Sequence, residues 1–338
     1  MTDITQKSRI NGALFGLYIG DALAMPVHWY YDRDALKQDY GYVTDYLPPK
    51  NPHPGSILSY KEYDPVNKKG DILHDQAQYW GKKGIHYHQF LKAGENTLNV
   101  KICSLLIDSL NEKGGYDADD YLERYISFMT TPGMHRDTYV EEYHRHFFTE
   151  YAKGTPPKKC GMEEKHIGGL VGLAPIILFY CNDHRKAREA ALEHLSLSHL
   201  GKLMEDAANI FIDILLSLMS SGSLREEILK SMGSPLLPFD ADDFIKWLDQ
   251  PDKEIVGGRF SAACYVNESI PSVAYLAYKY SDNPEECLIA NTNLGGDNAY
   301  RGAVLGAILG AANGFDAWPD RWVRGLYEPP PQIDAKAP

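Results

Sequence analysis

Asn293-Leu-Gly-Gly-Asp-Asn-Ala-Tyr-Arg-Gly-Ala-Val-Leu-Gly-Ala-Ile-Leu-Gly-Ala-Ala-Asn-Gly314 is the segment that decides the fold of this chain. It begins as a polar loop, in which two glycines permit a tight turn before an Asp-Asn pair that favours a helix start. It continues with the period of a helix, with Gly302, Gly306 and Gly310 on one ridge. Glycine costs about 1 kcal/mol relative to alanine inside a helix, so this ridge predicts that another backbone passes very close.

A matching segment lies near the N-terminus. Gly12-Ala-Leu-Phe-Gly-Leu-Tyr-Ile-Gly-Asp-Ala22 also spaces its glycines four residues apart. We predict that the two small-faced helices pack together although nearly the whole chain separates them, which would bring Asp21 and Asp297 to one cleft. The alternative is that each helix packs against a bulky neighbour and the similarity is accidental.

Helical periodicity dominates the rest of the chain. Few stretches alternate with a period of two, so the chain is predicted to be all-α. Helices are expected at residues 8–24, 96–112, 118–130, 139–153, 168–181, 184–195, 200–221, 224–231, 241–249, 270–280, 284–291 and 299–314. We interpret residues 1–327 as a single domain with a long loop or lid at 30–93, followed by a proline-rich tail at 328–338.

Composition and charge limit the classes of partner. Of the 338 residues, 44% are hydrophobic and 24% are charged, which is ordinary for a soluble globular protein. The formal net charge of −12 and the lack of a long Lys/Arg block argue against a nucleic-acid backbone as partner. The same charge repels anionic ligands unless a local basic patch exists.

The cysteines and the apolar segment near the N-terminus indicate the cellular compartment. Five widely spaced cysteines without a Cys-x-x-Cys pair indicate buried, reduced thiols and therefore a cytoplasmic protein. Gly16, Gly20 and Asp21 interrupt the apolar run near the N-terminus. We therefore expect no signal peptide, no membrane-spanning helix and no membrane partner.

Several motifs resemble the ADP-ribosylglycohydrolase family, which includes dinitrogenase-reductase-activating glycohydrolase. The Gly16-Leu-Tyr-Ile-Gly-Asp-Ala22 segment and the Gly295-Gly-Asp297 loop before a Gly/Ala helix are similar to the motifs that open and close that family. The resemblance implies a compact orthogonal bundle of many helices. A nearer resemblance, to jellyfish J1-crystallins and selenoprotein J, rests on Pro26-Val-His-Trp-Tyr-Tyr-Asp32, His86-Tyr-His88, Gly94-Glu-Asn-Thr-Leu-Asn99, Asp137-Thr-Tyr-Val-Glu-Glu-Tyr-His144 and Lys165-His-Ile-Gly-Gly-Leu170.

The resemblance also implies a metal and a ligand. In that family two magnesium ions grip the ribose hydroxyls of ADP-ribose while carboxylates assist cleavage of the glycosidic bond. In this chain Glu95, Asn96 and Asp297 remain as candidate magnesium ligands. Glu95 and Asp297 are the only carboxylates left at the positions of the family's metal ligands, which argues against a standard two-magnesium centre.

The chain departs from the family pattern at most ligand positions. His28 stands where an early Glu is expected, Gly94 stands for a Thr, and Ala299 and Tyr300 replace an Asp and a Thr. A further segment, Ile167-Gly-Gly-Leu-Val-Gly-Leu-Ala-Pro175, lacks the Asn and Arg that the family often carries before a similar Ala-Pro. Losing them removes groups that orient a nucleotide and meet its phosphate charge.

Glu95 and Asp297 are the predicted catalytic acids. Cleavage at an anomeric carbon develops positive charge that a nearby carboxylate stabilises or traps. The alternative for Glu95 is an ordinary acid at a helix N-terminus. The residues expected to bind the substrate lie at or beside the same motifs: Asp21, His28, His86, His88, Asn96, Asn298 and Arg301.

Histidines and aromatic residues gather at these motifs as well. A transition-metal site of His86, His88, Glu95 and Asp297 is an alternative, but no compact ligand spacing supports it, and hydrogen bonding to a ligand is preferred. His166 and His199 lie beside further motifs, and a structural role is the alternative for every one of these histidines. The aromatic residues could stack on a base or sugar, or could serve packing alone: Trp29, Tyr30, Tyr31, Tyr60, Tyr63 and Trp80.

Two functional hypotheses follow from the sequence. The first is a hydrolase that cleaves an N- or O-glycosidic bond of an ADP-ribosyl or other ribosyl small molecule, with a metal site depleted relative to the family. The second is a non-catalytic binding or structural protein, as the crystallin resemblance permits. The sequence does not define the oligomeric state.

Overall fold

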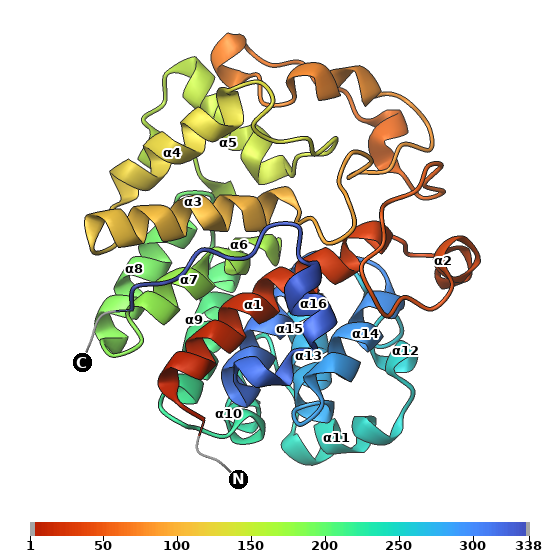
Figure 1. Ribbon diagram of the computed structural model, residues 1–338, viewed down its shortest axis with the longest axis vertical. Helices are drawn as coiled ribbons and strands as arrows, with labels where there is room; N and C mark the ends of the chain where they lie inside the picture. Colours follow the sequence, from red (N-terminus) through yellow and green to blue (C-terminus); the bar gives the residue numbers. More distant parts are fainter. Residues whose placement is uncertain (1–3, 336–338) are drawn as a thin grey trace.

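The computed structural model describes residues 4–335, and this part of the chain is mostly helical (Figure 1), which confirms the predicted all-α class. Two strands of two residues, β1 (Met162–Glu163) and β2 (His199–Leu200), pair in parallel. The α-helices are α1 (Gln6–Ala24), α2 (Arg33–Tyr40), α3 (Leu98–Lys113), α4 (Ala118–Thr130), α5 (Glu142–Lys153), α6 (Gly168–Val171), α7 (Leu173–Phe179), α8 (His184–Ser196), α9 (Lys202–Met219), α10 (Leu224–Lys230), α11 (Ala241–Lys246), α12 (Asp252–Ile255), α13 (Val266–Lys279), α14 (Pro284–Leu294), α15 (Asn298–Asn313) and α16 (Asp320–Gly325).

Helices α1 and α15 pack against each other along their glycine ridges at the centre of the fold (Figure 1). Gly16 faces Gly306 and Gly20 faces Gly302, so the two helices are antiparallel. A Cβ atom built on any of these four glycines would lie less than 3.0 Å from a backbone atom of the other helix. The predicted pairing is therefore confirmed, and its physical cause is that the backbones meet where no side chain fits.

The segment at 30–93 is more ordered than a loop. It contains helix α2, which Asp32 caps by accepting hydrogen bonds from two backbone N–H groups, and three short 3₁₀ helices. Leu58, Ile72 and Tyr87 are buried in it. The sequence signal was weak because α2 is largely polar and buries only Leu36. The predicted loop thus contains one α-helix and three short 3₁₀ helices, and the rest of it has no regular secondary structure.

Smaller differences concern helix boundaries. The predicted helix 168–181 is divided into α6 and α7 at Gly172, and α13 begins at Val266 rather than at residue 270, with Pro271 inside it. The short helices α12 and α16 were not predicted. Each is a few residues long, so neither has enough turns to produce a periodic pattern.

The N-terminal helix also corrects one expectation. By length and hydropathy, Gln6–Val27 reaches the range of a membrane-spanning helix, although the glycines and Asp21 were expected to prevent this. In the fold, 89% of the apolar window is buried inside the protein. Its apolar character is accounted for by packing in the core.

The tail runs back across the molecule (Figure 1). Before it, the backbone N–H of Tyr327 donates to the carbonyl of Gly94, at the turn that precedes α3. Farther on, Asn111 donates to the carbonyl of Gln332 and accepts from the N–H of Asp334. The last residues of the tail, 336–338, lie outside the described residues.

Candidate functional site

The Gly295-Gly296 turn positions Asp297 at the first residue before α15. Both glycines have positive φ angles, 68° and 67°, and a Cβ on either would collide with a backbone carbonyl. The backbone N–H of Gly296 donates to the carbonyl of Tyr30, and the carbonyl of Gly296 accepts from the N–H of Trp29. The N–H of Asp297 donates to Ala262 over 2.8 Å. The carboxyl group is thus fixed from two sides, and it makes no capping bond to its own helix.

A second carboxyl group, that of Glu141, lies in the same neighbourhood. Glu141 precedes α5 in the same way that Asp297 precedes α15, and it too makes no capping bond. One ring nitrogen, His166 Nε2, lies 3.4 Å from Asp297 Oδ2 and 3.6 Å from Glu141 Oε2. Tyr300 donates to Glu141 Oε1 over 3.1 Å. Three segments distant in sequence therefore bring two buried acids to one imidazole.

The hydrogen bonds of His166 define which of its nitrogens carries the proton. Its Nδ1 accepts from the backbone N–H of Gly168 over 3.0 Å. In the neutral ring the proton must then sit on Nε2, which faces the two acids. Neither His166 Nε2 nor Asp297 Oδ2 has a closer hydrogen-bond partner within residues 4–335.

Burial favours the neutral form of each of these groups, so it raises the pKa of the acids and lowers the pKa of the histidine. It raises the pKa of Glu141 well above its ordinary value, and the negative charge of Asp297 adds to that shift. It also raises the pKa of Asp297, although His166 and Arg301 oppose the change. It lowers the pKa of His166 to about 4. The site therefore contains two acids with raised pKa values beside a neutral imidazole.

Behind Asp297, two histidines form a chain of hydrogen bonds. His28 Nε2 lies 3.1 Å from Asp297 Oδ1, and His28 Nδ1 lies 2.8 Å from His88 Nε2. His88 Nδ1 lies 3.0 Å from Asp137 Oδ1. Three hydrogen bonds need three protons, whereas two neutral imidazoles supply two. The four side chains must therefore share one further proton, as a carboxylic acid or an imidazolium.

Glu95 lies at the far end of this chain rather than beside Asp297. Its carboxylate accepts from Lys101 over 3.0 Å, from Arg136 over 2.9 Å and from the backbone of Lys92. Burial opposes its ionisation, but Lys101 and these hydrogen bonds lower its pKa overall. Lys101 also lies 3.5 Å from Asp137. Glu95 and Asp297 are thus linked only through intervening side chains.

Asp21 and Asn96 meet each other at the start of α3. Asp21 accepts from the side chain and backbone of Thr97, over 2.6 Å and 2.8 Å, and from Asn96 over 2.9 Å. Burial raises the pKa of Asp21 to about 6 despite these bonds. Neither residue contacts Asp297 by a hydrogen bond in the described structure. Their bonds tie α1 to α3.

The remaining predicted residues bond to the backbone around the site. His86 approaches the carbonyl of Pro26 with one nitrogen and accepts from the N–H of His88 with the other. Asn298 donates to carbonyls at the ends of η1 (Met25–Val27) and within α14. Arg301 is fully buried and donates to Asn291 and to the carbonyl of Gly295. These groups position the loop that carries Asp297.

A cavity of about 260 Å³ opens beside Glu141 and His166. Part of its wall comes from the segment at 30–93, which covers this side of the site. The lining residues are Trp29, Tyr31, Ile57, Lys61, Tyr87, Tyr139, Glu141, Glu142, Glu164, His166, Cys264 and Tyr265. The cavity thus combines aromatic rings with carboxyl groups.

Trp29 is the strained residue of this wall. Its φ angle is 65°, a left-handed conformation that bulky residues rarely adopt. The hydrogen bond from its N–H to the carbonyl of Gly296, 2.8 Å long, holds it there. Its indole N–H is buried and has no acceptor among the described residues. Such strain concentrates at functional sites, where the surrounding structure imposes it.

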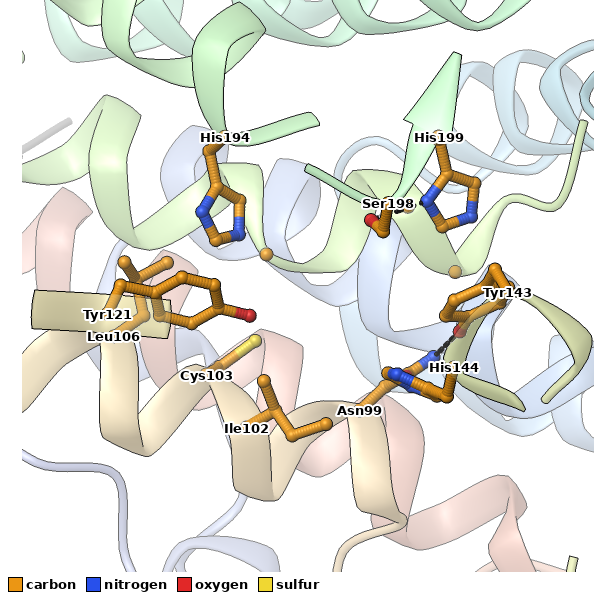
Figure 2. A pocket seen from close by; sticks show the side chains of 13 residues that line it. Asn99, Ile102, Cys103, Leu106, Tyr121, Tyr143, His144, His194, Ser198 and His199 are labelled. Carbon is orange, nitrogen blue, oxygen red and sulfur yellow. Dashed lines mark hydrogen bonds between the residues drawn. The ribbon is translucent and has the colours of Figure 1, made fainter. Parts of the chain in front are cut away.

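A second, smaller cavity of about 40 Å³ lies between α3 and the α6–α8 region (Figure 2). Cys103, Tyr121, His194 and His199 come from different elements to line it. Burial lowers the pKa of His194 to about 3. No carboxyl group lines this cavity, and its volume suits one or two water molecules. It lacks the acids that cleavage at an anomeric carbon requires.

The donor atoms around Asp297 do not suit magnesium, which prefers an octahedron of oxygen ligands. The oxygens of Glu95 are engaged by cations, as described above. His166 and Cys264 stand near Asp297, and one ligand atom from each of the three lies within 4.8 Å of the others. One nitrogen, one sulfur and one carboxylate form a softer set. The proton on His166 Nε2 also opposes a metal at that nitrogen.

Glu141, Asp137 and Lys101 were not among the predicted site residues. Glu141 and Asp137 lie in the Asp137–His144 motif, which was noted as a resemblance without a role for either acid. His166 was noted beside another motif. The sequence does not show that Glu141, His166 and Asp297 lie close together, because they belong to three separate segments of the chain.

Comparison with known proteins places this arrangement in a family. An uncharacterized protein of Archaeoglobus fulgidus is 24% identical over 328 residues, which are 95% of this chain and 92% of that protein. A solved structure described as an ADP-ribosylglycohydrolase-related protein complex is similar in fold, with a TM-score of 0.61, 21% identity, and coverage of 95% of this chain and 93% of that one. The family model described as ADP-ribosylglycohydrolase matches residues 2–337. The chain belongs to the ADP-ribosylglycohydrolase family.

Proposed function

We propose that the protein is a glycohydrolase that cleaves the glycosidic bond of a ribosyl small molecule in the cavity beside Glu141. The observation that carries this proposal is the position of Glu141, which is 5% exposed, lines the cavity and has a raised pKa. A carboxyl group that keeps its proton near neutral pH can act as a general acid. Family membership supports a glycohydrolase-type reaction.

The reaction follows from these groups. Glu141 gives its proton to the leaving atom as the bond to the anomeric carbon breaks. Positive charge then develops on the ribosyl ring, and the Glu141 carboxylate and Asp297 stabilise it. Water adds to the anomeric carbon and returns a proton to Glu141. No metal takes part in this sequence of steps.

The other residues support these two acids. Tyr300, which stands where the family has a threonine, orients Glu141 through its hydroxyl. His28 holds one oxygen of Asp297, so that the other faces His166. In this proposal Glu95 supports the far end of the histidine chain through Lys101, rather than touching the substrate.

The test is hydrolysis of a panel of N- and O-ribosyl compounds, ADP-ribosyl ones included, by the wild type and two variants. Glu141→Gln keeps the shape and hydrogen-bond acceptor but removes the acidic proton, and a loss of about 100-fold in kcat or more is expected. Glu189→Gln, which removes an exposed ion pair with Arg185 on α8 away from the cavity, is the control and should retain activity. Equal activity of the Glu141 variant and the wild type would refute the assignment.

One observation favours the non-catalytic alternative, a crystallin-like binding or structural protein. Most polar atoms of Asp21, His28, His86 and Asn96 are engaged with other parts of the protein. A protein that only binds a ligand would show no turnover of any ribosyl compound, and Glu141→Gln would leave ligand binding intact.

A further inference from the structure

We infer that the cavity selects a ribosyl compound that is neutral or positively charged and carries a flat aromatic group, and that it rejects compounds bearing phosphate. This inference rests on the proposed function, because it names the substrate class of the same cavity. It differs from the ADP-ribosyl ligand that the family resemblance implies.

The charge of the cavity wall is the first argument. Glu141, Glu142 and Glu164 line it, and Asp297 lies just behind His166, whereas Lys61 is the one base among the described lining residues. Even with Glu141 protonated, the acids outnumber the base. A phosphate dianion placed here meets like charges in a partly enclosed space, where water screens them poorly.

Arg145 and Arg301, whose charges act on Glu141 and Asp297, do not line the cavity. Arg145 donates to the carbonyl of Val140 and lies over the rings of Trp80 and Tyr139, at 5.2 and 5.9 Å from their centres, and it does not line the cavity. Arg301 is fully buried and bonded to Asn291 and Gly295. Phosphate recognition by paired guanidinium hydrogen bonds has no counterpart on this wall.

The helix start that could bind an anion carries an acid of its own. Helix N-termini attract phosphate through their free N–H groups and dipole. At α15 the residue before the first turn is Asp297, whose carboxyl makes no hydrogen bond to the helix but adds a further acid at its start, and the N–H of Gly296 is bonded to Tyr30. This acid opposes the attraction that the helix N–H groups would exert on a phosphate.

The aromatic wall is the second, independent argument. Tyr31 and Tyr265 are 57% and 51% exposed, and both line the cavity. Deeper in, Trp29 meets Tyr87 and Tyr139 edge to face, with ring centres 4.6 and 4.9 Å apart. Exposed rings beside carboxyl groups bind flat rings, and cationic ones most strongly.

Four ligands built on adenosine test the charge preference: adenosine, 1-methyladenosine, AMP and ADP-ribose. Binding is measured by calorimetry with the Glu141→Gln variant, which is not expected to cleave them, and with the wild type. At low ionic strength we expect adenosine and its methylated cation to bind at least about tenfold more tightly than AMP and ADP-ribose. Raising the salt to about 0.5 M should narrow the difference, because the repulsion is screened.

Substitution of the wall acids locates the effect. The double variant Glu142→Gln/Glu164→Gln should reduce the difference between adenosine and AMP by about threefold or more, and Glu189→Gln on α8 is the control that should leave it unchanged. AMP or ADP-ribose binding as tightly as adenosine would overturn the inference, as would binding of none of the four. Hydrolysis that depends on Glu141 would support the proposed function in either case, so the two failures are distinguishable.

Discussion

Asp297 and Asp137 stand at opposite ends of one hydrogen-bonded chain that passes through His28 and His88. The planes of the two imidazole rings are within 4° of each other. Asp297 has little positive charge in contact with it, whereas Asp137 pairs with Lys101. Although burial opposes ionisation of Asp137, Lys101 and His88 lower its pKa overall. The shared proton of the chain is therefore held between an ionised acid and one whose pKa is raised.

The Asp137→Asn variant tests this chain. Removing the charge leaves His88 without its buried acidic partner, whereas Lys101 keeps Glu95, and a loss of roughly 1–3 kcal/mol in the free energy of unfolding is expected. Urea unfolding measures it. Asp71→Asn is the matched control, because Asp71 also pairs with a histidine, His74, but is 36% exposed, so its loss should stay below roughly 1 kcal/mol. Equal losses in both variants would contradict the role of the buried chain.

The contact between α1 and α15 predicts a large effect of one methyl group. Gly306→Ala places a Cβ against the backbone of Gly16, so the helices must separate, at a cost of roughly 3 kcal/mol or more. Thermal unfolding measures the loss. Ala312→Ser, near the end of the same helix and partly exposed, should change stability by less than roughly 0.5 kcal/mol. A fully stable Gly306→Ala protein would contradict the packing of the two backbones.

Asp21 predicts a pH dependence of stability. Its pKa rises from 3.8 to about 6 in the folded protein, so the folded state binds more protons than the unfolded state between these values. Stability from this group is therefore greatest below pH 3.8 and falls as the pH rises toward 6, by roughly 3 kcal/mol in total. Asp21→Asn should remove this slope, whatever its effect on overall stability. Asp64→Asn, at an exposed position, should leave the slope of the wild type unchanged.

The proposed role of Glu141 predicts the pH profile of hydrolysis. A general acid must be protonated, so kcat/KM should be highest at low pH and fall as the pH rises through the raised pKa of Glu141. Tyr300→Phe removes the hydroxyl that stabilises the ionised form, so the falling limb should move to higher pH. A limb at the ordinary pKa of a glutamate would argue against Glu141 as the acid.

The donor set predicts a weak response to magnesium. Chelation by EDTA, or addition of Mg²⁺ to about ten times the protein concentration, should leave the melting temperature unchanged within error, because an ion stabilises the fold only when its concentration reaches its dissociation constant. Differential scanning fluorimetry measures it. A rise of several degrees with Mg²⁺ that is lost in Asp297→Asn would show that oxygen ligands assemble there after all.

Several parts of the site were predictable because the signal is local. The glycines of residues 12–20 and 302–310 predicted a closely packed helix pair. The Gly295-Gly296 turn predicted that Asp297 lies at the start of a helix. His28 and His88 could be recognised as members of motifs, but not as partners in one chain. The sequence could not identify Glu141 rather than Glu142 as the buried acid of the site, because two adjacent glutamates differ only in the direction in which the fold orients their side chains.

The helical class and the central α1–α15 pair follow from the sequence alone, because helical periodicity and glycine spacing are local patterns that can be recognised along the chain. The tertiary structure alone decided which acid faces the cavity, which histidines touch and which carboxyl groups are matched by cations. Burial and distance set those properties, and both depend on segments that the chain brings together from far apart. Glu95 and Asp297 had the same predicted role in the sequence. Their neighbours in the fold make Glu95 an ion-paired carboxylate and Asp297 a buried acid with a raised pKa.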